Sequence, residues 1–154
     1  MLGVDVACRV GNAIYPDHYD RGWHITGSTG TIGAAAGCAR LLGLNADQTQ
    51  MAIGIAASQP VGMREQFGTM TKPLHVGQSA RNGLYAALLA SEGFTASNDA
   101  LEHKQGFLKV FNGDGNFTIA PIIAEWGDPW DIVDPGLAIK QYPCCGSTHP
   151  AIDA

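Results

Sequence analysis

The segment 27–43 constrains the fold most, because nearly all of its residues are small. Gly33 and Gly37 lie four residues apart, so in a helix they share one face and let a neighbouring helix approach closely. The chain has 20 glycines in 154 residues, which is nearly double the average usage of about 7%. Many of them lie inside apolar stretches. They therefore predict close packing between helices and not a flexible linker.

This segment predicts a helix from about Thr31 to Leu42. Ser28 or Thr29 would cap its start, and Gly43 would end it. The repeated glycines are not a dinucleotide-binding fingerprint, because that motif follows a strand, whereas the residues before position 27 form a polar loop.

Other parts of the chain also carry helical periodicity. Apolar and small residues at helical spacing predict helices in 1–14 and 73–92, and Asn45 with Gln48 forms a capping box for a helix ending near Ser58. Three short-looped helices around one loop-borne site predict an all-α bundle, mainly α in class, for residues 1–118. A first helix without a cap and a new helix beginning at Pro150 suggest that both ends are cut from a longer protein.

Residues 119–154 have a different pattern. Turn residues separate two short β-prone runs, 130–133 and 137–142, and the second alternates between two faces. We predict that this part begins a smaller α+β domain, with strands only after about residue 129. Lys140 would lie on one face of the second strand, either as a functional group or as an exposed strand lysine.

Composition excludes several classes of partner. The net charge is -5 and the basic residues form no run, which argues against nucleic acid and membrane surfaces as partners. No stretch approaches 18 apolar residues, and no signal peptide opens the chain. These features predict a cytoplasmic protein.

The four cysteines give no disulfide framework. Cys8 and Cys38 lie in helix-like segments and are expected to be small buried hydrophobes. Cys144, Cys145 and His149 are an alternative set of metal ligands, but their spacing matches no strong zinc pattern and a fourth ligand is missing. We expect no metal.

The stretch Thr71-Lys72-Pro73-Leu74-His75 is electrostatically unusual. Proline is common at the first helical position, which places Lys72 at the N-cap. A helix N-terminus carries partial positive charge, so a lysine there is disfavoured. With His75 one turn further on, the site would suit an anion, although a solvated surface lysine is the alternative.

A second candidate lies at the end of the polar, aromatic loop 15–26. Loops of this composition often carry function, and this one ends near His24. Histidine has an unperturbed pKa of about 6.5, which makes His24 a natural proton carrier.

Four motifs together resemble the MmgE/PrpD family of 2-methylcitrate dehydratases and cis-aconitate decarboxylases. The resemblance extends over nearly the whole chain, and the motifs occur in the family's order. They are Gly22-Trp23-His24-Ile25-Thr26-Gly27, Leu41-Leu42-Gly43-Leu44, Thr71-Lys72-Pro73-Leu74-His75-Val76-Gly77, and Lys140-Gln141-Tyr142-Pro143-Cys144-Cys145 through His149-Pro150. The resemblance implies a large all-α domain, a smaller α+β lid domain and an active site between them. It also implies homodimers that act on small polycarboxylates without metal or organic cofactor.

The same resemblance implies which residues form the site. His24, Lys72 and Lys140 match family active-site positions, with Lys140 contributed by the lid. An acidic residue, a further histidine and a tyrosine of the family site would fall outside this chain. We expect His24 to be the general acid/base, and Lys72, His75 and Lys140 to bind substrate carboxylates.

The sequence is also compatible with two other hypotheses. Family members also include epimerases, which abstract and return a proton without losing a group. The second hypothesis is that the chain is a non-enzymatic remnant that serves only in packing or dimerisation.

Overall fold

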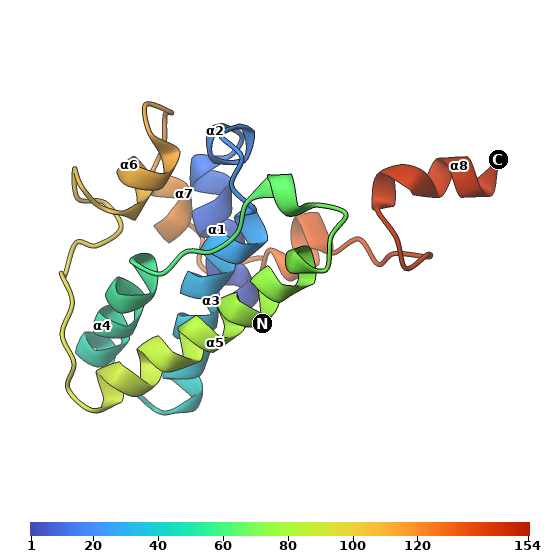
Figure 1. Cartoon of the computed structure of the whole chain (residues 1–154). Helices are drawn as coiled ribbons and strands as arrows, with labels where there is room; N and C mark the ends of the chain where they lie inside the picture. The colour runs from blue at the N-terminus through green and yellow to red at the C-terminus, as the bar shows by residue number, and fades with distance from the viewer.

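The computed structural model covers residues 1–154 and consists of helices and their connections. The four long helices are α1 (Leu2–Ile14), α3 (Ile25–Leu41), α4 (Ala46–Ala57) and α5 (Thr71–Ser91) (Figure 1). The short helices are α2 (Asp17–Asp20), α6 (Phe107–Asn112), α7 (Ala120–Ile123) and α8 (His149–Asp153), and single helical turns occur at Arg64–Gln66, Ile132–Gly136 and Gly146–Thr148. The predicted mainly α class is confirmed. None of these helices has the length and hydropathy needed to cross a membrane.

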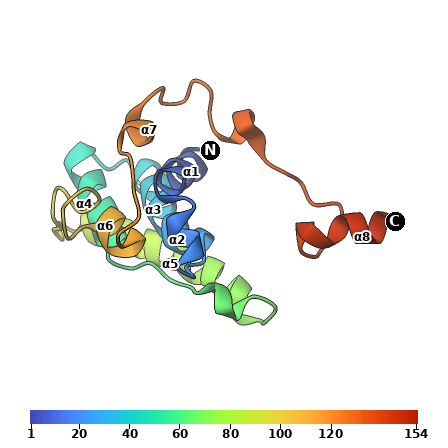
Figure 2. The same ribbon diagram turned by 90° about the horizontal axis from the view of Figure 1, so that it is seen from above.

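Helix α3 is the centre of the fold, because it packs against α1, α4 and α5. Figures 1 and 2 show it lying between α1 and α5. The core that it shares with α4 and α5 is built almost wholly of alanine: Ala35, Ala39, Ala52, Ile55, Ala56, Ala86, Ala87 and Ala90. Such small side chains bury little area each, so the stability of this core depends on close approach of the helices.

Close approach is visible at individual glycines. A Cβ atom on Gly33 would lie 2.8 Å from the Cβ of Ala7 and would collide with the carbonyl oxygen of Gly3. A Cβ atom on Gly83 of α5 would lie 2.7 Å from the backbone nitrogen of Ala35. Real Cβ atoms are not found so close to other atoms, so these positions require glycine. The prediction of tight packing at Gly33 is confirmed.

Helices α3 and α5 run parallel. Three contacts show this: His75 with Gly27, Ser79 with Gly30, and Gly83 with Ala34. The residue numbers increase together along both helices, as they do only in a parallel pair. The N-termini of both helices therefore lie at the same end of the bundle.

The start of α3 differs from the prediction. The helix begins at Ile25, six residues before the predicted start, and His24 occupies the N-cap position. The predicted caps are inside the helix: the Ser28 hydroxyl lies 2.7 Å from Nε2 of His18, and the Thr29 hydroxyl donates to the Ile25 carbonyl. Serine and threonine can bond to a side chain or to the preceding turn as well as cap a helix, so composition alone did not locate the start.

The other helix boundaries agree more closely. The capping box of Asn45 with Gln48 is present, and α4 ends at Ala57 before Ser58. Helix α5 begins at Thr71, and Met70 is its N-cap. The prediction that Lys72 is the N-cap is therefore wrong, and Lys72 lies in the first turn.

The predicted strands are wrong. Residues 132–136 form a single turn that is interrupted by extended backbone at Asp134 (φ -142, ψ 118), and 137–140 are without regular structure. The one β-bridge in the chain joins Trp23 to Met63. An extended segment becomes a strand only when a neighbour pairs with its backbone groups, and no residue of 1–154 pairs with this one. Figures 1 and 2 show α8 lying outside the packed helices.

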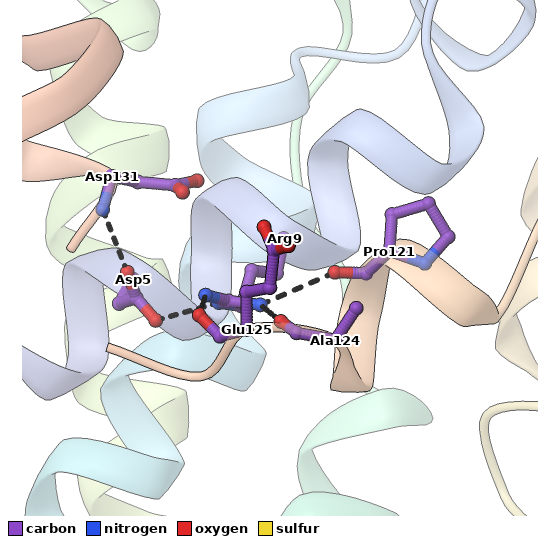
Figure 3. Close-up of polar contacts among 6 residues, drawn as sticks. All are labelled: Asp5, Arg9, Pro121, Ala124, Glu125 and Asp131. Carbon is purple, nitrogen blue, oxygen red and sulfur yellow. Dashed lines mark hydrogen bonds and ion pairs between the residues drawn. The ribbon is translucent and has the colours of Figure 1, made fainter. Parts of the chain in front are cut away.

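A buried ion pair joins the C-terminal segment to α1 (Figure 3). Nε of Arg9 lies 2.7 Å from Oδ2 of Asp5, and both side chains are almost fully buried. The Arg9 guanidinium also donates to the carbonyls of Ala124 and Glu125, at 2.5 and 2.9 Å. The other carboxylate oxygen of Asp5 accepts from the backbone nitrogen of Asp131 at 2.9 Å. Two side chains of α1 thus hold both ends of the segment 124–131.

A second buried group, His18, joins α2 to α6. Its Nδ1 donates to the Phe111 carbonyl at 3.0 Å, and its Nε2 faces the Ser28 hydroxyl. Its ring is fully buried and stacks on Trp23. Burial lowers the pKa of His18 below its ordinary value of 6.5, while the Phe111 carbonyl acts weakly in the opposite direction. His18 is therefore neutral in the folded protein at neutral pH.

We predict that Arg9→Met lowers the free energy of unfolding by about 3 to 5 kcal/mol, because it leaves the buried Asp5 carboxylate without its partner. Urea unfolding monitored by circular dichroism measures this. Arg40→Met is the matched control, since Arg40 is exposed and should change stability by less than about 0.5 kcal/mol. Equal effects of the two substitutions would contradict the role given to the pair.

We predict that the chain loses stability as pH falls below about 6.5. The unfolded chain then binds a proton that folded His18, with its lowered pKa, resists, so the free energy of unfolding rises with pH in this range. The slope from His18 is at most about 1.4 kcal/mol per pH unit. Urea titrations between pH 5 and 8 should show a weaker slope in His18→Gln but not in the control His103→Gln. An unchanged slope in His18→Gln would refute the prediction.

Candidate active site

The backbone around His24 is fixed by a short antiparallel pairing of two loops. The His24 nitrogen donates to the Gly62 carbonyl at 3.1 Å, and the Arg64 nitrogen donates to the Gly22 carbonyl at 2.8 Å. At the other end, the His24 carbonyl accepts from the nitrogens of Gly27 and Ser28 and so opens α3. His24 is thus held at the exact junction between a paired loop and a helix N-terminus, which fixes the direction of its side chain.

The structure brings His24 and His75 into contact. Their Nδ1 atoms are 3.1 Å apart, although the residues are 51 positions apart in sequence. Both side chains are nearly buried, with 5% and 6% exposure. Gly62 packs directly against them, because a Cβ atom there would lie 2.7 Å from Nδ1 of His75 and 3.2 Å from the Cβ of His24.

Phe67 connects the histidine pair to Lys72. Its ring meets His24 edge-on at 5.0 Å between centroids, and Nζ of Lys72 lies 4.5 Å from the centre of the same ring. A cation over an aromatic face is stabilised by about 0.5 to 1 kcal/mol. Phe67 was not among the expected site residues, and the only signal for it in the sequence is its place in the glycine-containing loop before Thr71.

The electrostatics of this cluster favour neutral His24 and a bound anion. Burial lowers the pKa of His24 below 6.5, and the charges of His75 and Lys72 lower it further. Lys72 lies in the first turn of α5, and His24 caps α3, so two positive helix ends face the same region. Such a place offers both fixed positive potential and an imidazole that can accept or donate a proton.

The structure does not bring Lys140 into this cluster. Its ammonium group donates to the Cys144 carbonyl at 2.9 Å in an exposed segment. The pKa of the Cys145 thiol is lowered, first by hydrogen bonds with Ser147 and then by the charges of Lys140 and Lys72. Burial acts on this pKa in the opposite direction.

The cysteines and the histidine near the C-terminus do not form a metal centre in the structure. The chain has no group of three or more histidine, cysteine or acidic side chains arranged to hold a metal ion. Cys144 lies 3.2 Å from the Thr148 hydroxyl, and His149 meets Tyr142 edge-on. Cys8 and Cys38 are half-buried, so the expectation that they are buried is only partly met.

Comparison with known proteins gives a consistent result. The family model for the MmgE/PrpD N-terminal domain matches residues 1–120. A cis-aconitate decarboxylase of Aspergillus terreus is 37% identical over 161 aligned residues, covering 100% of this chain and 32% of the relative. The cis-aconitate decarboxylase of Homo sapiens is 33% identical over 132 residues, covering 86% of this chain and 27% of the relative. The chain thus spans about a third of the length of the curated relatives it matches.

We predict that Gly62→Ala disturbs the histidine pair, because the new methyl group would overlap the ring of His75. The matched control is Gly68→Ala in the same loop. Gly68 has φ +90, close to the φ +98 of Gly62, but open space where the Cβ would go. Both variants carry the backbone cost of about 1 kcal/mol, and Gly62→Ala should lose about 1 to 3 kcal/mol more through overpacking. Urea unfolding compares them, and equal losses would show that Gly62 does not support the pair.

Proposed function

The chain belongs to the MmgE/PrpD family, and we propose that the whole protein is a cofactor-independent lyase acting on small polycarboxylates. The observation that carries this proposal is the contact between His24 and His75 beside Lys72, at the N-termini of two parallel helices. A polycarboxylate needs fixed positive charge to bind, and its cleavage beside a carboxylate needs a positioned proton carrier. This cluster offers both.

Each group has a distinct proposed role. His24 transfers the proton, because its lowered pKa leaves it neutral and able to exchange a proton near neutral pH. Lys72 and His75 bind a substrate carboxylate from the helical side. Lys140 binds a second carboxylate from the opposite side, after the segment that carries it moves toward the cluster.

Decarboxylation of cis-aconitate is the reaction that the relatives favour, since those matched above are named as cis-aconitate decarboxylases. Loss of CO2 leaves an electron pair on carbon that must be protonated. Dehydration of a 2-methylcitrate-like substrate instead needs one group to remove a C–H proton and another to protonate the departing hydroxyl. Both reactions use the same anion site and the same proton carrier.

The pair of adjacent imidazoles also favours a second candidate, epimerisation of a dicarboxylate. That reaction abstracts a proton from carbon and returns one, so two neighbouring proton carriers would serve it. Product analysis separates it from lyase activity, because an epimerase releases neither CO2 nor water.

The proposal extends to the organisation of the whole protein. We propose that residues 1–118 belong to the all-α domain and that residues 119–154 begin the lid that carries Lys140. The whole protein would work as a homodimer in the cytoplasm. The substrate would then be enclosed between the helical wall at His24 and the lid.

We predict that substitutions at His24, Lys72 and Lys140 have different kinetic effects in the full-length protein. His24→Ala should lower kcat by roughly 100-fold to 10,000-fold, as expected for loss of a general acid/base. Lys72→Ala and Lys140→Ala should mainly raise KM, because each removes a charge that pairs with a substrate carboxylate, at a cost of about 2 to 5 kcal/mol.

Steady-state kinetics on cis-aconitate, 2-methylcitrate and citrate, with an epimerisation assay alongside, measures these effects. Lys104→Ala is the matched control, since Lys104 is exposed and far along the chain from both lysine motifs. Wild-type turnover in His24→Ala would remove its proposed role. If wild-type protein turns over none of these substrates, the packing-module hypothesis replaces the lyase.

A further inference from the structure

The 3.1 Å contact between the Nδ1 atoms of His24 and His75 restricts where protons can lie. Two bare nitrogens at this distance repel each other, and two N–H groups would collide. The contact is a hydrogen bond only when one Nδ1 carries a proton and the other does not. In the neutral pair, the ring that donates through Nδ1 has a bare Nε2, and the ring that accepts has a protonated Nε2.

Both Nε2 atoms are available for chemistry. The contact between the two Nδ1 atoms is the only hydrogen bond that either ring makes within the chain. Neither Nε2 is among the buried side-chain atoms left without a partner, so both retain contact with solvent. The neutral pair therefore presents one proton acceptor and one proton donor at the same time, whichever ring takes which role.

We propose that His24 and His75 act as one proton-sharing dyad, in which His75 is a second proton-transfer group and not only a ligand for a carboxylate. This inference rests on the proposed lyase function and deepens it.

The dyad balances the protons of a dehydration without any other group. The bare Nε2 takes the proton from a substrate C–H bond, whose electrons form the new C=C bond. The bridging proton moves from one Nδ1 to the other, and the protonated Nε2 gives its proton to the departing hydroxyl, which leaves as water. The dyad ends neutral, with the two tautomers exchanged.

A decarboxylation uses the dyad with one additional proton. Both Nε2 atoms then carry a proton, and one proton bridges the Nδ1 atoms. When the C–C bond to the carboxylate breaks, CO2 leaves and its bonding electrons stay on the substrate. One Nε2 gives its proton to the resulting carbanion, and the dyad returns to its neutral form and takes a proton from water.

The surroundings set the pH range in which each form exists. Lys72 on α5 is the charged group that, together with His75, acts on His24, and both lower its pKa after burial does. On the loop before α5, Arg64 is directed to the Tyr19 carbonyl and Glu65 to its neighbour Gln66. The first turn of α3 carries no titratable side chain. For a decarboxylation, kcat/KM should therefore fall as pH rises through a value below about 6.5, because the reaction needs the protonated dyad. For a dehydration, kcat/KM should rise over the same range, because the reaction needs the neutral dyad.

The first test is His75→Asn in the full-length protein. Asparagine places a hydrogen-bonding group near the position of Nδ1 but cannot titrate or offer an Nε2. We expect kcat to fall roughly 100-fold, with KM rising by a smaller factor because His75 also contributes to carboxylate binding. The pH at which kcat/KM changes should move to a higher value, because the charge of His75 no longer lowers the pKa of His24. A raised KM with wild-type kcat would assign His75 to binding alone and overturn the proposal. Wild-type kinetics with an unchanged pH dependence would do the same.

The second test is independent of turnover. Full-length protein labelled with 15N-histidine, with His24→Gln and His75→Asn used for assignment, reports the tautomer of each ring by NMR. The dyad requires opposite tautomers for the two rings at pH 7.5. Two Nε2–H tautomers would overturn it. If the tautomers are opposite but no polycarboxylate is turned over, the lyase function fails, and the catalytic use of the dyad fails with it, while the hydrogen bond stands.

Discussion

The close parallel packing of α3 on α5 is the constraint on which the candidate site depends. Glycine and alanine at the contact, such as Gly83 against Ala34, let the two backbones approach until a single added carbon would overlap. Because the helices run parallel, this approach also aligns their N-termini. His24 at the cap of one helix and His75 near the start of the other meet as a consequence. The packing of the core and the geometry of the site are therefore one feature.

The site combines groups that separately oppose stability. Lys72 lies at the positive end of a helix, where a cation costs a few tenths of a kcal/mol or more. Contact with the ring of Phe67 offsets this by a similar amount. Burial of two histidines beside that lysine keeps His24 neutral. Lys72 has no acidic partner among the ion pairs of the chain, so its positive charge is available to an anion.

The sequence could predict the helices and the tight packing, because both follow from local patterns. The capping box at Asn45 and the small residues around Gly33 each act through neighbours in the chain. It could not predict the contact between His24 and His75, since no periodicity relates positions in different helices. The expected strands at 130–133 and 137–142 failed for the same reason: pairing is a tertiary property. The roles of Lys72 and Lys140 stay predictions.

The buried pair of Asp5 and Arg9 links this helical wall to the segment that carries Lys140. It fixes the backbone as far as Asp131, and Lys140 follows nine residues later (Figure 3). Nine residues in extended form span at most about 30 Å, so the anchor limits the positions that Lys140 can reach. If Lys140 binds substrate as proposed, the anchor at Asp131 therefore limits where its ammonium group can lie.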